Sequence, residues 1–242
     1  MRSGLSAGIR QRLLHRGPRS RPGGALLRGD DAVPSDAAGD ARRALLRRAA
    51  AAGTFRFLRA EEDSDMERRL LELIPEFELI EDAELRRRTL DAFLSALRRG
   101  GWTPDDLTRM PFTLLIEPCP ANMVQHVRAV TRAARAAAAE LSAMLGEAFS
   151  PDMDVLTSGA LLHDVGKLLE YEERGGAFVK SRFGALLRHP FSGVAVADEA
   201  GLPAEVQHII AVHSKEGDHS KRSPEAFIVY YADYMSFQPL RG

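Results

Sequence analysis

The dipeptide His163-Asp164 places two strong metal ligands side by side, in the string ALLHDVGK that covers residues 160–167. Imidazole and carboxylate together suit first-row metals such as Mn, Fe, Co, Ni and Zn. Further candidate ligands lie on both sides of the dipeptide: His126, His189, His213 and Asp233. Together, the six residues predict a metal centre.

The spacing of these residues suits a bundle of helices. Successive members of the set are 37, 1, 25, 24 and 20 positions apart, which allows one ligand or one pair per helix. Each helix of a bundle can aim such a residue inward. Taken singly, each histidine could instead be a buried core residue or a helix-terminal residue, so the joint occurrence favours the metal centre. Three histidines are left outside the site: His15, His208 and His219.

Asp233 adds independent weight because it lies in the apolar string AFIVYYADYMSF, residues 226–237. A helix that is apolar on nearly all sides is buried. A buried carboxylate must be paired or bind a metal, since its desolvation otherwise costs several kcal/mol. The alternative is a carboxylate that accepts hydrogen bonds from the amides of a helix N-terminus.

Lys167 follows His163 by four residues and Asp164 by three, so on a helix the three share a face. Its ammonium could then contact a substrate phosphate or a developing oxyanion. Pairing with Asp164 is the alternative. Lys215 and Arg222, in the segment after His213, are further candidates for binding a substrate phosphate, although a solvated loop explains them as well.

The hydrophobic periodicity predicts an all-α fold, with no sustained strand pattern. Residues 173–181 form a polar loop that contains Gly175-Gly176, and Ala177-Phe178-Val179 could be a short extended piece. A proline with an acidic first turn opens a further helix after Thr103. The other predicted helices cover residues 65–75, 82–99, 122–146, 150–171, 188–200, 203–213 and 224–237.

The first 63 residues are predicted to be a disordered arm, because strings such as RGPRSRPGG (16–24) have no apolar period. Residues 1–60 hold 13 Arg and 4 Asp, which leaves 20 of the 33 basic and 30 of the 34 acidic residues in the part expected to fold. An acidic domain counts against an extended nucleic-acid surface.

The composition also limits the location of the protein. No stretch approaches the ~18 consecutive apolar residues of a membrane span, so we expect no membrane contact. The single cysteine, Cys119, excludes an internal disulfide and a thiolate zinc site. These features favour a cytoplasmic protein.

The chain resembles the HD-domain metal-dependent phosphohydrolase superfamily. The resemblance rests on His126, His163-Asp164 and Asp233 and on the strings LLHDVGK, RHPFSG and EAFIVYYADYMSF. His189 and His213 also match the subset that holds two metals with six ligands. The resemblance implies an HD helical bundle in residues 119–242, with residues 64–118 as a helical extension of it.

The resemblance further implies how the ligands are divided. His126, His163, Asp164 and Asp233 would hold one divalent ion, and His189 and His213 would hold a second, with Asp164 bridging. Two such ions can share a hydroxide that attacks phosphorus in line with the leaving oxygen. The implied activity is hydrolysis of a phosphomonoester or phosphodiester of a small, nucleotide-like molecule, with Asp164 and Lys167 as catalytic residues.

Three alternatives use the same features. Some HD-fold enzymes hold two irons with the same six ligands and activate oxygen, and the metal would distinguish them. The C-terminal strings also resemble ribonuclease Y, an RNA phosphodiesterase, although that family carries a membrane anchor and an RNA-binding KH domain that are not evident here. The third alternative is a non-catalytic sensor module. The complete set of six ligands disfavours it, because a binding module has no need for a second metal.

Overall fold

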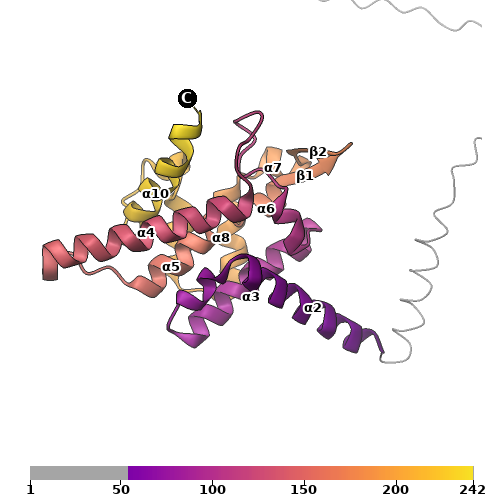
Figure 1. Ribbon diagram of the computed structural model, residues 1–242, viewed down its shortest axis with the longest axis horizontal. Helices are drawn as coiled ribbons and strands as arrows, with labels where there is room; N and C mark the ends of the chain where they lie inside the picture. The colour runs from indigo at the N-terminus through magenta and orange to yellow at the C-terminus, as the bar shows by residue number, and fades with distance from the viewer. Residues whose placement is uncertain (1–53, 242) are drawn as a thin grey trace, which may run out of the picture. The chain divides into compact units, whose positions relative to one another are not determined.

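The computed structural model describes residues 54–241, and Figure 1 shows that they are mainly helical. The all-α prediction is confirmed for these residues. The longer helices are α2 (Thr54–Leu73), α3 (Ala83–Gly100), α4 (Met123–Leu145), α5 (Met153–Leu162), α8 (His189–Glu199), α9 (Ala204–Val212) and α10 (Pro224–Arg241). Shorter elements are η1 (Pro75–Leu79), η2 (Pro104–Thr108), η3 (Gly146–Ala148), α6 (Lys167–Glu170), β1 (Tyr171–Arg174), β2 (Ala177–Lys180), α7 (Arg182–Leu186) and η4 (Lys215–Gly217).

Helix α5 lies at the centre of the bundle and packs against α3, α4, α9 and α10. Its start is fixed by Asp152, whose carboxylate accepts hydrogen bonds from the backbone amides of Asp154 and Val155. From Leu156 to Leu162 every residue is buried, as expected for a helix enclosed by others. Gly159 allows α9 to approach closely, because a Cβ there would lie 2.5 Å from the side chain of Ile209. This central helix delivers His163 and Asp164 to the middle of the bundle.

Residues 64–118, predicted as a helical extension, share one hydrophobic core with the helices that follow. Phe77 and Phe93 from this part pack edge to face, with ring centroids 5.8 Å apart. The Trp102 indole donates a hydrogen bond of 2.8 Å to the backbone oxygen of Leu168, next to the central turn. The extension therefore supports the segment that carries the candidate ligands.

The helix predicted over residues 150–171 is interrupted, and the prediction of a continuous helix is wrong. Helix α5 ends at Leu162, residues 163–166 form a turn, and α6 follows. The break coincides with Gly166, where a Cβ would lie only 2.1 Å from the backbone oxygen of His189. The close approach of α8 thus requires glycine here, and the turn places His163 and Asp164 at the end of α5.

The segment predicted as a polar loop over 173–181 belongs to an antiparallel hairpin of β1 and β2, with Tyr171 paired to Lys180 and Arg174 to Ala177. The short extended piece predicted at residues 177–179 is confirmed as part of β2. Gly175 and Gly176 form its two-residue turn and both have positive φ, of 60° and 81°. Such tight turns need residues that tolerate positive φ at both central positions, which glycine does. Helix α7, which follows the hairpin, was not predicted.

Several boundaries also differ from the prediction. Helix α2 begins at Thr54, before the predicted end of the arm at residue 63, and the rest of that arm, residues 1–53, lies outside the described residues. His208 belongs to neither group of candidate ligands, as expected, and its Nε2 accepts a hydrogen bond from the Ser223 amide. Within residues 54–241, no helix combines the length and apolarity needed to cross a bilayer.

Candidate metal centre

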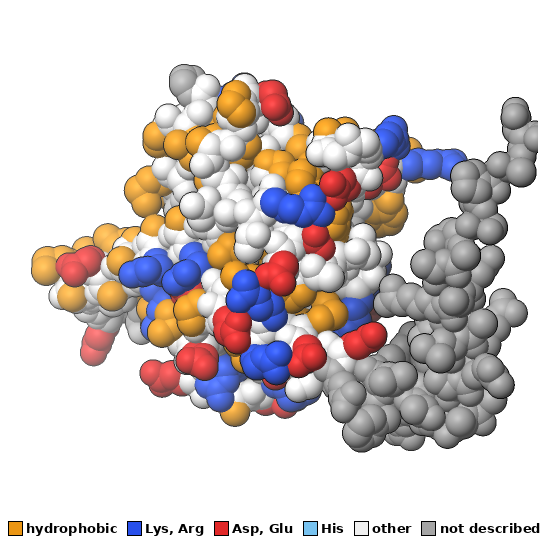
Figure 2. Space-filling model, turned by 45° about the vertical axis from the view of Figure 1, so that its right-hand side comes forward, with side chains coloured by type: hydrophobic (Ala, Val, Ile, Leu, Met, Phe, Trp, Pro, Cys, Tyr) orange, Lys and Arg blue, Asp and Glu red, His pale blue; other side chains and the backbone are white. Residues whose placement is uncertain are grey.

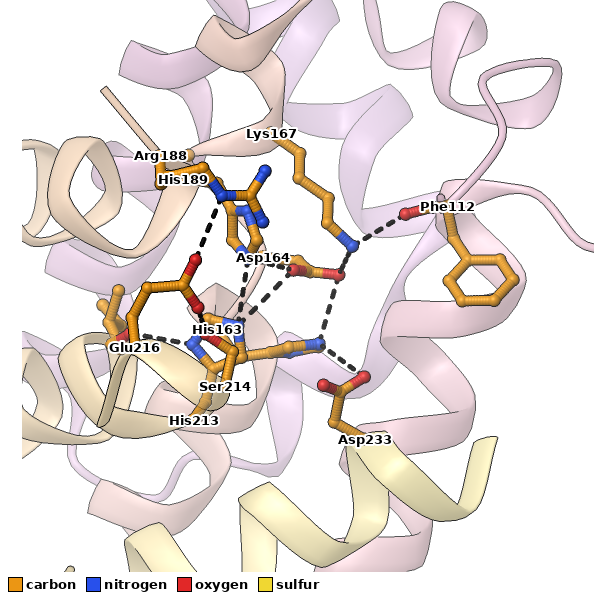
Figure 3. A network of polar contacts seen from close by, with 12 residues as sticks. Phe112, His163, Asp164, Lys167, Arg188, His189, His213, Ser214, Glu216 and Asp233 are labelled. Atoms are coloured by element: carbon orange, nitrogen blue, oxygen red, sulfur yellow. Dashed lines mark hydrogen bonds and ion pairs between the residues drawn. The ribbon is translucent and has the colours of Figure 1, made fainter. Parts of the chain in front are cut away.

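The structure brings the six predicted ligands together from five elements, as Figure 3 shows for most of them. His126 comes from the first turns of α4, and His163 and Asp164 follow α5. His189 begins α8, His213 ends α9 and Asp233 lies within α10. The four histidines and Asp164 are buried, whereas the Asp233 side chain is 18% exposed. The centre therefore lies inside the bundle and reaches solvent beside α10.

Asp164 divides the ligands into two groups, because its two oxygens face different histidines. Oδ2 lies 3.0 Å from His126 Nε2 and 3.4 Å from His163 Nε2. Oδ1 lies 3.4 Å from His189 Nε2 and 3.6 Å from His213 Nε2. Asp233 joins the first group, with Oδ1 3.3 Å from His126 Nε2. The arrangement has the shape of two metal positions with Asp164 between them.

The spacing within each group fits a metal ion. His126 Nε2 and His163 Nε2 are 3.1 Å apart, and His189 Nε2 and His213 Nε2 are 3.3 Å apart. Metal–nitrogen bonds of about 2.1 Å place adjacent ligand atoms about 3.0 Å apart in an octahedron and about 3.4 Å apart in a tetrahedron. The donor set, imidazole with carboxylate, suits first-row divalent metals. The spacings between the histidine nitrogens in both groups are therefore compatible with a bound ion.

Hydrogen bonds on the outer ring nitrogens orient the four histidines. His163 Nδ1 donates to the Ala160 oxygen at 2.7 Å, and His213 Nδ1 donates to the Ile210 oxygen at 2.8 Å. His189 Nδ1 lies 2.9 Å from Glu170 Oε2, and His126 Nδ1 lies 3.0 Å from Ser236 Oγ. A proton held on Nδ1 leaves the Nε2 lone pair free to bind a metal. All four rings are thus set for metal binding through Nε2.

The electrostatics of the site favour cations. Burial lowers the pKa of His189 to about 4, so this ring is neutral near pH 7 and can act as a ligand. Burial opposes charge on His126 as well, but its hydrogen bonds with Asp164 and Asp233 raise its pKa overall. The same carboxylates would favour a divalent ion in place of that proton.

Lys167 lies beside the centre, as predicted, but it is held by two partners. Its Nζ is 2.6 Å from Asp164 Oδ2 and 2.7 Å from the backbone oxygen of Phe112. Burial disfavours its charge, yet the adjacent Asp164 carboxylate raises its pKa above the usual value. The Phe112 ring stacks on His126, with centroids 4.4 Å apart, so the segment before α4 covers one side of the centre.

The two other residues predicted to bind substrate differ in their surroundings. Lys215 is exposed at the start of η4, two residues after His213. Arg222 is turned toward the protein: its guanidinium donates to the backbone oxygens of Val212 and Ser214 and to Asp218. It also stacks over the Tyr230 ring, with 3.9 Å between Cζ and the ring centroid. These contacts make Arg222 a structural residue of the segment between α9 and α10.

Two residues that support the candidate ligand rings, Glu170 and Ser236, were not predicted from the sequence. Glu170 is buried, and burial alone would raise its pKa, but hydrogen bonds from His189 and the charge of Arg188 lower the pKa to about 2. A weak signal exists for both residues. Ser236 follows Asp233 by three positions on one helix, and Glu170 is the one charged residue in the run LLEY after Lys167.

Comparison with known proteins is consistent with this geometry. The sequence model of the HD domain family matches residues 123–238, which contain all six ligands. Ribonuclease Y of Chloroflexus aurantiacus is 30% identical over 115 residues, which cover 48% of this chain and 18% of that protein. Ribonuclease Y of Pseudothermotoga lettingae is 32% identical over 99 residues, or 40% of this chain and 16% of that protein.

The similarity is therefore local. The chain spans less than a fifth of the length of these curated relatives. No solved structure matches the chain significantly.

Proposed function

The chain belongs to the HD-domain metal-dependent phosphohydrolase superfamily through residues 123–238, and on this basis we propose that it hydrolyses a phosphomonoester or phosphodiester. The substrate is a small, nucleotide-like molecule, and the cofactor is a pair of divalent ions of Mn, Fe, Co, Ni or Zn. The observation that carries the proposal is the position of Asp164, whose two oxygens face separate histidine pairs. A single carboxylate so placed is suited to bridge two ions.

The ligands divide between the ions by proximity. His126, His163 and Asp233 with Asp164 Oδ2 would hold the first ion, and His189 and His213 with Asp164 Oδ1 the second. Two divalent ions, when bound, would lower the pKa of a water molecule and neutralise charge on a phosphoryl group. The four histidines and Asp164 are buried, and burial strengthens the electrostatic interactions within the site.

Lys167 orients Asp164 and contributes positive charge on the side of His126. An ammonium has three protons to donate, and the contacts with Asp164 and Phe112 use two. We propose that the third is donated to a substrate phosphoryl oxygen. Lys215 remains a second candidate for a phosphate contact, because it is exposed and follows His213 closely.

The surface agrees with a small substrate rather than a long nucleic acid. On the described residues of the face drawn in Figure 2, basic and acidic side chains are interspersed and form no continuous basic surface. An extended nucleic-acid site is usually strongly basic. RNA is nevertheless the second candidate substrate, because the two curated relatives described above are both ribonuclease Y.

A substrate screen tests the proposal. The protein would be freed of metal, loaded with Mn²⁺ and assayed without oxygen against p-nitrophenyl phosphate, bis(p-nitrophenyl) phosphate, nucleotides and a short single-stranded RNA. We expect metal-dependent release of the leaving group that Asp164→Ala abolishes. Cleavage of the RNA alone would favour the second candidate. Strict dependence on iron together with oxygen consumption would reject hydrolysis and support the oxygenase alternative.

A further inference from the structure

The two halves of the centre are supported in different ways. In the half that contains Asp233, the outer nitrogens of His126 and His163 contact a hydroxyl and a backbone carbonyl, both neutral. In the other half, His189 Nδ1 contacts the carboxylate of Glu170. Among residues 54–241, that half also has fewer candidate ligands, since His189, His213 and Asp164 alone face it. A position with few ligands depends more strongly on how each ligand is held.

Glu170 holds His189 at two points. Its Oε2 accepts hydrogen bonds from the backbone amide of His189 at 2.8 Å and from Nδ1 at 2.9 Å. Its other oxygen, Oε1, pairs with Arg188 and lies 3.2 Å from Lys180 Nζ on β2. Because the Glu170 carboxylate binds both the backbone amide and the ring of His189, it fixes the orientation of His189 relative to α6.

Arg188 extends this support toward His213. Its Nε donates to Glu216 Oε1 at 3.0 Å, and Glu216 Oε2 accepts a 2.6 Å hydrogen bond from the hydroxyl of Ser214. Ser214 directly follows His213. A chain of charged contacts, Glu170–Arg188–Glu216, therefore joins the start of α8 to the segment after α9. Figure 3 shows Arg188 and Glu216 beside His189 and His213.

We propose that Glu170 is a positioning residue for the second metal position, and that the network Glu170–Arg188–Glu216 determines whether the centre holds one ion or two. The inference rests on the proposed two-ion centre and concerns only the half formed by His189 and His213. Substitution of a residue that orients a metal-binding histidine commonly weakens metal affinity by about 10- to 100-fold. The network touches neither His126 nor Asp233, so the first position keeps its affinity.

Metal titration of the full chain tests this inference. Chelator-treated protein would be titrated with Mn²⁺ by equilibrium dialysis, and electron paramagnetic resonance would distinguish coupled ion pairs from single ions. We expect two ions per wild-type chain and a coupled signal. In Glu170→Gln, which keeps the shape but removes the charge, the second affinity should fall about 10- to 100-fold. The coupled signal should then give way to that of single Mn²⁺ at matched metal concentration.

Two control variants distinguish an effect on the second metal position from a general loss of metal binding. Glu173→Gln, on β1 three residues after Glu170 but paired with Arg109, should bind two ions as the wild type does. Ser236→Ala removes the hydroxyl behind His126, so it should weaken the first position and leave the second unchanged. This opposite pattern would link each affinity to its own support.

The contrary results are equally specific. Unchanged affinity for two ions in Glu170→Gln, equal loss at both positions, or a single ion in the wild type would each overturn the inference. If Glu170→Gln does not fold, Glu216→Gln is used, which leaves Glu170 in place and should weaken only the second position. Two ions in the wild type without any phosphoester cleavage would count against the proposed function and not against this inference.

Discussion

The Nζ of Lys167 lies 2.6 Å from Oδ2 of Asp164, the same oxygen that faces His126 and His163. Asp164 lies in the turn that separates α5 from α6, and Lys167 begins α6, so the two side chains meet across three positions. Burial alone would raise the pKa of Asp164, but the charge of Lys167 and the contacts with the histidines hold it well below the usual range. These contacts favour the ionised carboxylate of Asp164 and fix its orientation.

Lys167→Ala should lower turnover while leaving metal content near normal. Loss of its charge removes a repulsion of cations and so offsets the lost contact with Asp164, whereas the proposed contact with the phosphoryl group is lost without compensation. Removal of such a charge-stabilising contact commonly lowers the rate by about 10²-fold or more. Steady-state kinetics and metal analysis of the same preparation would check this. Loss of metal in parallel with activity would show that Lys167 acts only through Asp164.

Gly166→Ala should disturb the second metal position. The added methyl group would meet the His189 oxygen at 2.1 Å and the Ser192 hydroxyl at 2.6 Å, so α8 must shift. Overpacking of this kind typically costs about 1–3 kcal/mol. Thermal unfolding and Mn²⁺ titration would measure both effects. Gly146→Ala is the control. Alanine is strained at this positive φ of 57°, but the residue is remote from the candidate ligands in sequence and in contacts, so metal binding should not change. Normal metal binding by Gly166→Ala would show that the second metal position does not depend on the close approach of α8.

Phe93→Ala should destabilise the whole described domain, since α3 and the HD helices share one core. Phe93 is 1% exposed, and replacement of a buried phenylalanine by alanine costs about 3–5 kcal/mol. Urea unfolding followed by circular dichroism would give the change. Leu115→Ala, at a side chain that is 74% exposed, should change stability by no more than about 0.5 kcal/mol. Separate unfolding of residues 64–118 would refute the shared core.

Glu216 should stabilise the fold down to mildly acidic pH. Burial opposes its charge, but hydrogen bonds from Ser214 and Arg188 lower its pKa from 4.5 to about 2. A depressed folded-state pKa gives a contribution that is complete above the unfolded value and lost as pH falls from about 4.5 toward 2. The stability deficit of Glu216→Gln relative to wild type should therefore shrink over this range. Urea titrations at several pH values would show it, and a constant deficit would argue against the ion pair.

The candidate ligands could be predicted from the sequence because the residue types show their chemistry. The helices that carry them could be predicted from the spacing of the apolar residues. Asp233 was identifiable as a carboxylate in an apolar helix. The two histidines of the second half lie at helix ends, and the sequence marks both ends: Pro190 follows His189, and a polar run follows His213. The division of the six ligands by Asp164 came only from the family resemblance, and the distances agree with it.

Other features depend on tertiary contacts that no local pattern reveals. The apolar residues Leu168 and Leu169 continue the helical period past Gly166, which hides the turn. The contact between Glu170 and His189 spans 19 positions, and neither residue type specifies the other. Arg222 looked like a phosphate ligand because its positive charge is visible in the sequence, whereas the backbone oxygens that it binds are not.

Anomalous diffraction from crystals of the protein loaded with Mn²⁺ tests the two-ion centre most directly. We predict two anomalous peaks, one on each side of the Asp164 carboxylate, about 3.5–4 Å apart. One peak should be bounded by His126, His163 and Asp233, and the other by His189 and His213. A single peak at saturating metal, or a pair of peaks that Asp164 does not bridge, would contradict the proposed two-ion centre.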